Sequence, residues 1–511
     1  MPYPRLLSLC LAPLMLLPLA AQSQPPAAPA ASPRDAALVN RLTWGATPAE
    51  LARLRELGPE RYLQAQLRPD PKAALPPDVQ ASIDALPIAR ESAAQALARQ
   101  QAMRREAKDK PPAAAQQIQR QARLVSRERA EATASRALLR AVYAPNQLQE
   151  QMTWFWMNHF NVYANKSDIG TYIDQYEDRA IRPHALGKFR DLLAATLRSP
   201  AMLVYLDNTR NTAGHINENY ARELMELHTL GVKGGYTQTD VQELARILTG
   251  LGVNTSGEPP RVKPALRAQV VQDGLFLFNP ARHDYGEKRF LGRRIAGAGM
   301  AEVDQAVDML ARHPATARHI SAKLAQFFMG DAPPDAAIAR MARRFQETDG
   351  DIAATLEALF RSPEFAQSLE KGVFKDPVHY VYSSLRLAYA GLPPIVNPRP
   401  GLALLRRLGQ PLNLRLTPDG YPLSQSDWSG SGQMTARFEA ARAIAAAPAA
   451  FYRKNKNEAP EPVRLPDLLE ADARSGLFTG LSSATRQAIE SARNPRDANT
   501  YLLASPEFMR R

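Results

Sequence analysis

Three glutamates and one arginine lie close together in the stretch NENYARELMELHTLG, residues 217–231. If this stretch is helical, Glu218, Arg222 and Glu226 lie one turn apart on one line, with Glu223 beside them. Carboxylates at i, i+3 spacing have Cβ atoms roughly 5–6 Å apart, so one can raise the pKa of the other. One carboxyl can then act as a general acid while its neighbour stays ionised. Glu218, Glu223 and Glu226 are therefore candidate catalytic residues.

The same spacing also has a purely structural interpretation. Ladders of glutamate and arginine at i, i+4 are common on solvated helix faces and contribute roughly 0.2–0.5 kcal/mol per pair. Arg222 would then neutralise its neighbours instead of holding an anionic substrate group through its guanidinium. The spacing alone does not separate a site from a ladder.

Further candidates lie elsewhere in the chain. His159 ends an aromatic-rich segment and is a fourth catalytic candidate, although a histidine among aromatic residues is often a hydrogen-bonded core residue. His283 and Asp284 are expected in a turn, where polar side chains serve either the turn or a site. The candidate substrate-binding residues are Arg222, Asn158, Asn219, His283, Asp284 and Lys288.

The sequence requires no cofactor. It lacks the serine-hydrolase elbow, the zinc-protease helix, the P-loop and the dinucleotide-binding glycine pattern. A ferritin-like pair of Glu-x-x-His words is also missing, since Glu226 and His228 are only two residues apart. A divalent metal such as zinc, manganese or iron could bind a mixed set of His159, His283, Asp284 and the glutamates. Their spacing does not demand a metal, so the cofactor is left unassigned.

Two helices are predicted to position the glutamates. Tyr220, Leu224 and Leu227 recur with the spacing of one apolar helix face. Gly231 is expected to end this first helix, because glycine adopts the left-handed conformation of a helix C-cap without strain. A second amphipathic helix follows within residues 237–250. The signature stretch is therefore predicted to be an αα-hairpin.

The rest of the chain is predicted to be mainly α-helical. Residues 146–163 form a strongly apolar helix whose aromatic side chains belong in a core. Residues 88–139 are rich in Ala, Gln and Arg and predict a charged helical insertion, broken near residues 110–112. This insertion is interpreted as a surface spacer, with a lid over the site as the alternative. We expect one multi-helix domain built around the αα-hairpin.

Strand signals are confined to one region, residues 275–291. Its two short segments, residues 275–278 and 288–291, are predicted to pair as one small β-hairpin. The polar residues 282–284 would then lie at the tip of this hairpin.

The N-terminus predicts export. Arg5 precedes an apolar run and two small residues, the pattern of a secretory signal peptide. The apolar run is too short and too interrupted by proline for a membrane span, and no later stretch reaches roughly 18 apolar residues. The expected organisation is a signal peptide at 1–23, an Ala/Pro linker at 24–33 and the helical domain at 34–511. We therefore expect a periplasmic or secreted protein.

Charge and composition limit the expected partners. The 511-residue chain has a formal net charge of +13, which favours contact with anionic partners, although an arginine-rich proteome would also produce it. Aromatic residues make up only 7% and no nucleic-acid-binding motif occurs, so nucleic acid is not an expected partner. The only cysteine, Cys10, lies inside the predicted signal peptide, so the exported protein would contain no disulfide.

Several long words of the sequence resemble one bacterial family, catalogued as domain of unknown function 1800. These words are RLTWGATPAEL near Arg41, TWFWMNHF at 153–160, SPAMLVYLDN at 199–208, the stretch 217–250, FNPARHDYGEKRFLG at 278–292 and the C-terminal YLLASPEFMRR. The resemblance covers nearly the whole chain after the signal peptide. It implies a secreted, mostly helical protein, often encoded beside a second secreted protein with a sulfatase-like core.

The resemblance also bears on single residues. It implies that the acidic positions of residues 217–231 and the Asn-His-Phe word at 158–160 belong to a site. Tyr421 and Leu251 stand where the family is expected to have tryptophan, so an aromatic platform for sugars is not expected here. His228 stands where the family often has phenylalanine.

Two functional hypotheses follow from the sequence. The first is an exported hydrolase or lyase that acts on an anionic polymer through carboxylate acid/base chemistry. The alternative is a non-enzymatic envelope protein that binds or assembles with a secreted partner. The two differ in whether Glu218, Glu223 and Glu226 face a pocket or open solvent.

Overall fold

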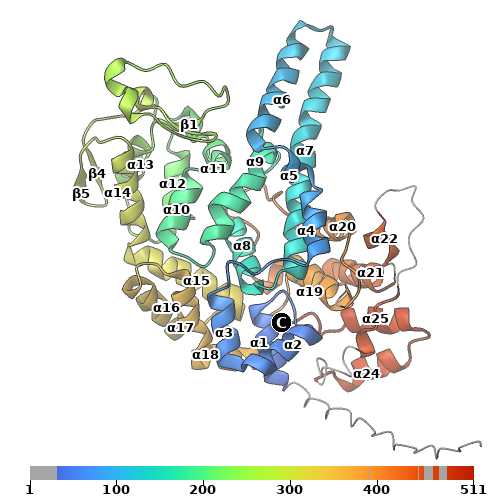
Figure 1. The fold of residues 1–511 in the computed structure, drawn as a ribbon. Coiled ribbons are helices and arrows are strands. Elements are labelled where there is room, and N and C mark those ends of the chain that lie inside the picture. The colour runs from blue at the N-terminus through green and yellow to red at the C-terminus, as the bar shows by residue number, and fades with distance from the viewer. Residues whose placement is uncertain (1–31, 390, 447, 454–463, 471–479) are drawn as a thin grey trace, which may run out of the picture. The chain divides into compact units, whose positions relative to one another are not determined.

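The structure is a computed structural model that describes residues 32–389, 391–446, 448–453, 464–470 and 480–511. The predicted signal peptide and most of the Ala/Pro linker lie outside these described residues. Within them, 63% of the residues are in helices and 5% in strands, which confirms the predicted mainly α-helical class (Figure 1). Residues from Ala31 to Arg511 form one compact unit.

Eleven α-helices precede the αα-hairpin in the part of the chain that the structure describes. They are α1 (Pro33–Leu42), α2 (Pro48–Leu57), α3 (Pro59–Leu67), α4 (Pro77–Asp84), α5 (Pro87–Arg90), α6 (Ala93–Glu106), α7 (Pro112–Tyr143), α8 (Gln147–His159), α9 (Ile169–Gln175), α10 (Phe189–Leu197) and α11 (Pro200–Tyr205).

The hairpin and the helices after it complete the unit. They are α12 (Asn219–Glu226), α13 (Gln238–Ile247), α14 (Met300–Ala311), α15 (Pro314–Met329), α16 (Asp335–Glu347), α17 (Ile352–Phe360), α18 (Pro363–Lys371), α19 (Pro377–Tyr389), α20 (Arg399–Arg407), α21 (Ser431–Ala446), α22 (Ala449–Tyr452), α24 (Ser483–Glu490) and α25 (Pro495–Leu503). Many of these helices begin with proline, whose fixed φ and missing N–H suit the first helical turn. This placement explains how a chain with 42 prolines can be mainly helical.

Short helical turns connect the longer elements. The 3-10 turns are Ala107–Asp109, Arg182–His184, Asn208–Arg210, Pro264–Gln269, Pro280–Arg282 and Gln425–Asp427, and Tyr176–Ile181 is a π-helical turn.

The predicted αα-hairpin is present, and α12 packs against α13. Gly231 and Gly250 have φ angles of +80° and +83° and lie in the turns that follow the two helices. The prediction that Gly231 ends the first helix is wrong, because α12 already ends at Glu226, with its C-cap at Leu227. The α13 helix begins with a capping box, in which Thr237 and Asp240 satisfy each other's backbone N–H groups. The α12 helix is shorter than the apolar pattern suggests, because residues 227–230 form a turn after Glu226.

The strands belong to two small antiparallel sheets. They are β1 (Leu251–Val253), β2 (Val271–Asp273), β3 (Phe276–Phe278), β4 (Lys288–Phe290) and β5 (Arg293–Ile295). The first sheet has the order β1-β3-β2, and β4 pairs with β5 in the second. The register aligns Leu251 and Val271 with Phe278 in the first sheet, and Lys288 with Ile295 in the second.

The prediction that residues 275–291 form one β-hairpin is therefore wrong. Tight turns decide the pairing: Gly274 at φ +55° joins β2 to β3, and Leu291 and Gly292 at φ +47° and +75° join β4 to β5. Two-residue turns with positive φ favour pairing between the strands that flank them. Residues 282–284 consequently lie in a loop between the two sheets and not at a hairpin tip.

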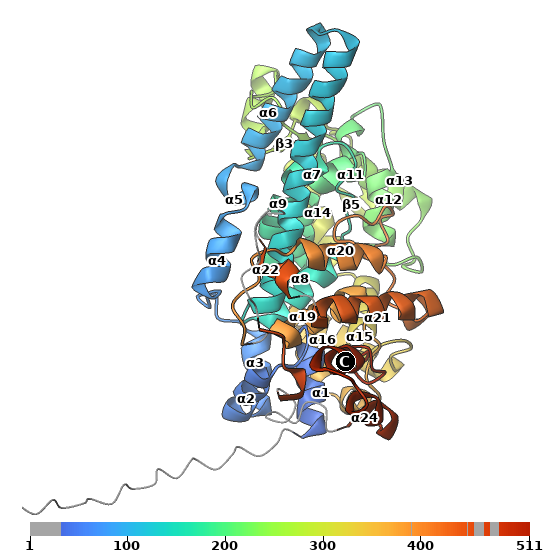
Figure 2. The same cartoon turned by 90° about the vertical axis from the view of Figure 1, so that its right-hand side faces the viewer.

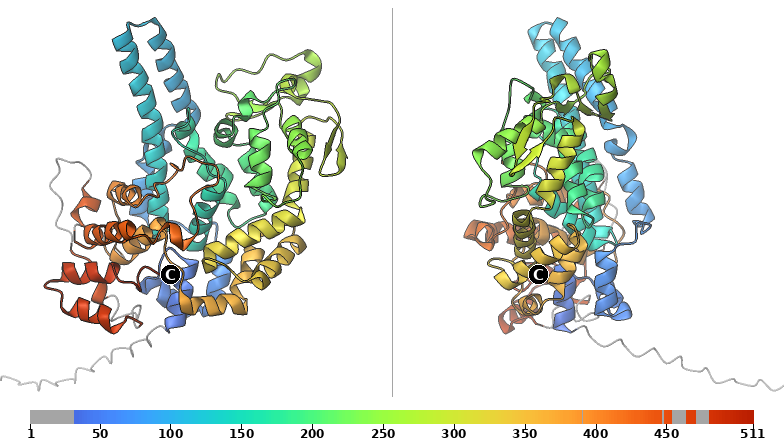
Figure 3. Two further views of the ribbon diagram at one scale, coloured as in Figure 1. Left: turned by 180° about the vertical axis from the view of Figure 1, so that it is seen from behind. Right: turned by 90° about the vertical axis from the view of Figure 1, so that its left-hand side faces the viewer.

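The segment 88–139 forms the hairpin of α6 and α7, interrupted before Pro112 (Figure 1). In Figures 1 and 3, α8 and α9 lie between this hairpin and the α12–α13 hairpin. The base of α7 is buried and not a solvated spacer: Arg129 pairs with Asp174 at 3.0 Å and Arg136 lies 3.5 Å from Glu177.

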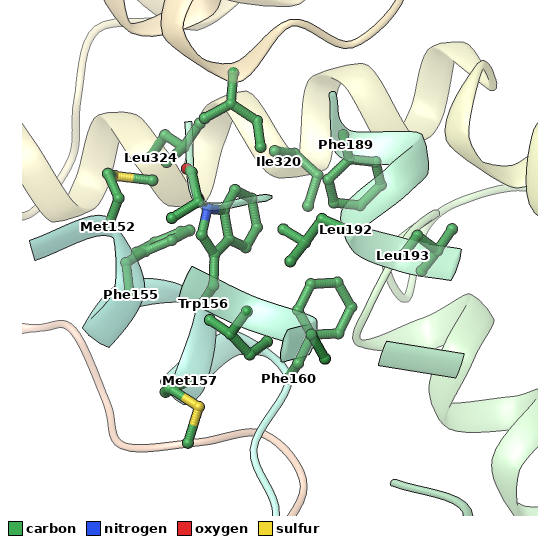
Figure 4. Close-up of a cluster of buried hydrophobic side chains, with 14 of the residues drawn as sticks. Met152, Phe155, Trp156, Met157, Phe160, Phe189, Leu192, Leu193, Ile320 and Leu324 are labelled. Carbon is green, nitrogen blue, oxygen red and sulfur yellow. Dashed lines mark hydrogen bonds between the residues drawn. The ribbon is translucent and has the colours of Figure 1, made fainter. Parts of the chain in front are cut away.

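The main apolar cluster is built around α8. The Trp156 side chain is fully buried, and its indole N–H donates to the Ala185 carbonyl at 2.9 Å. Figure 4 shows Phe155 and Phe160 beside this indole, with residues from α10 and α15 packed around them. A second buried cluster joins α7, α19, α21 and α25. The aromatic residues of α8 therefore form a core, as predicted, and fix the position of the adjacent Asn158 and His159.

Candidate functional site

The first part of the predicted glutamate ladder exists. The Arg222 guanidinium lies 2.9 Å from the Glu218 carboxylate, and Gln238 of α13 bonds to both side chains at 2.7 and 3.0 Å. Both members of the ion pair are partly exposed. Glu218 and Arg222 therefore connect α12 to α13. For these two residues, the structural interpretation of the spacing holds.

Glu223 and Glu226 are arranged differently. Within the described residues, neither carboxylate forms a hydrogen bond or a salt bridge. Glu223 is half-buried, and burial together with the charges of Glu226 and Asp419 raises the pKa of its carboxyl above the usual range. The neighbouring Arg222 opposes this shift without cancelling it. The structure thus contains the pair that the spacing suggested, in which one carboxylate raises the pKa of another.

Residues 413–421 approach this pair from a distant part of the sequence. Tyr205 Oη donates to the Leu416 carbonyl at 2.7 Å, and the Asn161 amide donates to the Thr417 carbonyl at 2.8 Å. These two bonds hold the segment so that the Asp419 carboxylate acts on Glu223. Burial, Asp419 and Glu223 also raise the pKa of Tyr205 to about 12, which places its hydroxyl in the same electrostatic environment.

Asn158 of α8 also binds the segment 413–421. Its amide nitrogen donates to the Tyr421 carbonyl at 2.9 Å, and its Oδ1 accepts from the Tyr421 N–H at 2.7 Å. Gly420 has φ +77°, and a Cβ at this position would lie 2.2 Å from the Asn158 carbonyl oxygen. Only glycine fits this approach, so Asn158 and Gly420 together position Asp419.

His159, at the end of α8, is buried. Its Nε2 lies 3.1 Å from the His228 carbonyl oxygen, and its Nδ1 has no partner in the described residues. Burial, and then the charge of Lys323, lower the pKa of His159 well below its usual value. The ring is buried among core aromatics, so it could exchange a proton with a substrate only through other groups.

Lys323 of α15 is a cation that sequence reasoning missed. Burial lowers the pKa of its ammonium to about 8, and the opposing charge of Asp419 limits the fall. No hydrogen bond or salt bridge to Lys323 occurs among the described residues. Its approach to Asp419 leaves no signal in the sequence, because α15 and residue 419 are far apart along the chain. For Asp419, the turn-forming word Pro-Asp-Gly at 418–420 was the only local signal.

His283 and Lys288 form a second cluster around Glu302 of α14. His283 Nε2 lies 2.6 Å from Glu302 Oε1, and Lys288 Nζ lies 2.6 Å from Glu302 Oε2, with all three side chains fully buried. Burial alone would raise the pKa of Glu302, but hydrogen bonds from His283 and Lys288 hold it below the usual range. Glu302 was not among the sequence candidates, and its carboxylate also completes the capping box of α14.

The other candidates serve local structure or join this second cluster. Asp284 pairs with Arg246 of α13 at 2.9 Å, and its carbonyl accepts from the Lys288 ammonium. The Asn219 amide donates to the Leu206 carbonyl at 3.1 Å. The candidates thus divide into the α12 group and the Glu302 cluster. Within the part of the chain that the structure describes, no three His, Cys, Asp or Glu side chains are grouped to hold a metal.

The arrangement around Glu223 predicts a measurable titration. In nuclear magnetic resonance experiments with labelled glutamate, the Glu223 carboxyl is expected to titrate above the ordinary glutamate pKa of about 4.3. The substitution Glu226→Gln removes a neighbouring charge, so the Glu223 pKa is expected to fall. Glu106→Gln, in the exposed part of α6, is the matched control. An unshifted Glu223 pKa, or one that ignores Glu226, would contradict the pairing.

Fold and site together define a mainly helical protein that carries a partly buried carboxylate pair on an αα-hairpin. The chain belongs to the family described as protein of unknown function (DUF1800), whose sequence model matches residues 37–510. Comparison with curated proteins and with solved structures gives no match. Among the described helices, none combines the length and apolar character needed to cross a membrane.

Proposed function

We propose that the protein is a hydrolase or lyase that acts on an anionic polymer through acid/base chemistry at Glu223 and Glu226. The observation that carries this proposal is the Glu223 carboxyl, which is half-buried, unpaired within the described chain and shifted upward in pKa by burial and by Glu226. Structural ladders place their carboxylates against cations, as Glu218 does with Arg222. An unpaired carboxylate beside a second one is typical of an acid/base site.

The two carboxyl groups would have different roles. Glu223, with the higher proton affinity, would hold a proton and deliver it to a leaving oxygen. Glu226 would act as the base and accept a proton from water or from a substrate carbon. Asp419 would maintain the Glu223 proton affinity by its charge.

Cations near the pair support an anionic substrate. Asp419 interacts electrostatically with Lys323, and Arg415 Nη2 lies 3.5 Å from its carboxylate. The formal net charge of +13 would draw polyanions toward the protein in general. Arg222 acts on Glu223 directly, and Lys323 and Arg415 interact with Asp419, so acidic groups of a polymer could bind beside the bond that reacts.

A panel of acidic polysaccharides tests the proposal. Wild-type protein is incubated with polygalacturonate, alginate and hyaluronate, and the release of reducing ends and of unsaturated ends is followed. Glu223→Gln is expected to lower the rate by at least about 100-fold, the usual contribution of a general acid. The same variant is expected to melt at a higher temperature at neutral pH, because a destabilising buried charge is removed.

Glu106→Gln again provides the control, with unchanged activity and melting temperature expected. If Glu223→Gln retains the wild-type rate on a polymer that the protein cleaves, the acid/base assignment is wrong. If it melts like the control, Glu223 does not carry the repulsion that the structure indicates.

The non-enzymatic alternative has one specific observation in its favour. Val232, in the turn between α12 and α13, is 71% exposed, so its apolar side chain could contact a partner protein. Under this alternative, Val232→Ser would abolish capture of a partner from the envelope, while Glu223→Gln would leave it unchanged.

We also propose that the chain is exported. We infer cleavage close to residue 23 from the basic, apolar and small-residue pattern of the N-terminus. Intact-mass measurement of protein isolated from the native envelope is expected to show loss of the first 20 or so residues. A mass that includes Met1 and the following apolar run would refute export by this route.

A further inference from the structure

A cavity of about 350 Å³ lies between α7, α20 and residues 411–414. None of the α12 glutamates lines it. The α20 helix packs against α7, and Figure 2 shows the two side by side. Most of the lining is apolar and comes from Ala130, Ala134, Leu402, Pro411, Leu412 and Leu414. A volume of this size is at the lower end of the range of small-ligand pockets, roughly 300–1,000 Å³.

Two arginines line the same cavity, Arg127 of α7 and Arg406 of α20. Neither forms a salt bridge or a side-chain hydrogen bond within the described residues. The acidic lining residue, Glu131, is already neutralised by Arg399, whose Nε lies 2.6 Å from its carboxylate. The cavity therefore combines an apolar wall with two uncompensated guanidinium groups.

We propose that this cavity binds a single-chain anionic amphiphile, an acyl chain that ends in a carboxylate. The apolar wall gains free energy by removing a hydrocarbon chain from water. The guanidinium groups of Arg127 and Arg406 match a carboxylate, since each can donate two parallel N–H groups to it. This site goes beyond the proposed function, because none of Glu218, Glu223 or Glu226 lines the cavity.

Equilibrium dialysis of labelled dodecanoate against the full chain tests the proposal. Dodecanol carries the same chain without the charge, and acetate carries the charge without the chain. Dodecanoate is expected to bind at one saturable site and at least about tenfold more tightly than dodecanol, as one charge-assisted pair would give. Acetate is expected to show no saturable binding, because its apolar part is too small to gain from the wall.

Substitutions separate this cavity from general surface binding. Arg127→Gln and Arg406→Gln are each expected to weaken dodecanoate binding by about tenfold. Ala130→Phe fills the cavity without changing charge and is expected to weaken binding at least as much. Arg407→Gln is the matched control, because Arg407 is exposed on the same helix but does not line the cavity.

Three results would overturn the proposal. They are the absence of saturable dodecanoate binding to the wild-type chain, equal affinity for dodecanoate and dodecanol, and equal affinity of the Arg127, Arg406 and Arg407 variants. Circular dichroism of each variant establishes that the helical fold is retained, so a loss of binding can be assigned to the cavity.

Discussion

Lowering the pH from about 7 to about 5 is expected to reduce the free energy of unfolding by about 6 kcal/mol through three buried histidines. These are His159, His228 and His319, on each of which the charge of Lys323 acts. Burial is the main cause that lowers their pKa values, to about 3 for His228 and about 4 for His319, and well below the usual value for His159.

The direction follows from where each proton binds. An unfolded histidine takes up a proton below about pH 6.5, whereas these three stay neutral in the folded protein until the pH is far lower. Stability is therefore complete above about pH 6.5 and falls as the pH drops, by about 1.4 kcal/mol per unit for each histidine. Glu177, whose pKa is raised to about 6 by burial, acts in the opposite direction. It is expected to restore about 1 kcal/mol near pH 5.

His228→Phe tests this effect on a single residue. Within the described residues neither ring nitrogen of His228 has a hydrogen-bond partner, so phenylalanine removes the titrating group without breaking a bond. Denaturant unfolding is expected to show a variant about 2 kcal/mol more stable than wild type near pH 5 and within about 1 kcal/mol of it above pH 7. His215→Phe, at an exposed position, should follow the wild-type pH dependence. Parallel curves for His228→Phe and wild type would disprove the assignment.

Glu302→Ala is expected to destabilise the protein by about 3–5 kcal/mol, the cost of leaving a buried charge without its partner. The substitution removes the carboxylate from Lys288 and from His283, whose side chains have no solvent exposure to replace it. It also frees the backbone N–H groups of Ala298 and Gly299, which bond to Glu302 Oε1 at 3.0 and 3.2 Å. Denaturant unfolding at neutral pH measures the loss.

Two further variants separate the buried charge from general effects. Glu287→Ala breaks an exposed ion pair with Arg294 and is expected to cost less than about 1 kcal/mol. The double variant Glu302→Gln with Lys288→Met keeps an acceptor for His283 but removes both charges, so it should recover most of the lost stability. If Glu302→Ala is as mild as Glu287→Ala, the cluster does not hold the sheet of β4 and β5 to α14.

Local patterns predicted the elements of the signature region well. The α12–α13 hairpin followed from its apolar stripe and from glycines in the turns after the helices, because these signals act within a few residues. The burial of Trp156 also followed, since a run of aromatic residues has no alternative to a core. The prediction of strand pairing failed because pairing depends on turn conformation. The positive φ of Leu291 could not be expected from its residue type.

The candidate site was predicted in part. The shift at Glu223 agrees with its spacing from Glu226, but the contribution of Asp419 comes from a segment nearly two hundred residues later. His283 and Lys288 were expected at a turn that could bind substrate, whereas both are buried against Glu302. No local pattern indicates such an encounter, because it depends on how α14 packs beside the β4–β5 sheet.

The surroundings of Arg41 have a consequence for the order in which the chain folds. The α1 helix is made early, but its buried Arg41 donates to the carbonyls of Phe328, Ser368 and Arg511, up to 470 residues later. An unpaired guanidinium cannot be buried cheaply, so α1 cannot settle into its final place until those distant carbonyls exist. Local helices can form during synthesis, whereas closure of the fold must be a late, long-range event. Folding is therefore expected to be slow for a helical protein, with a long-lived intermediate in which α1 is still exposed to solvent.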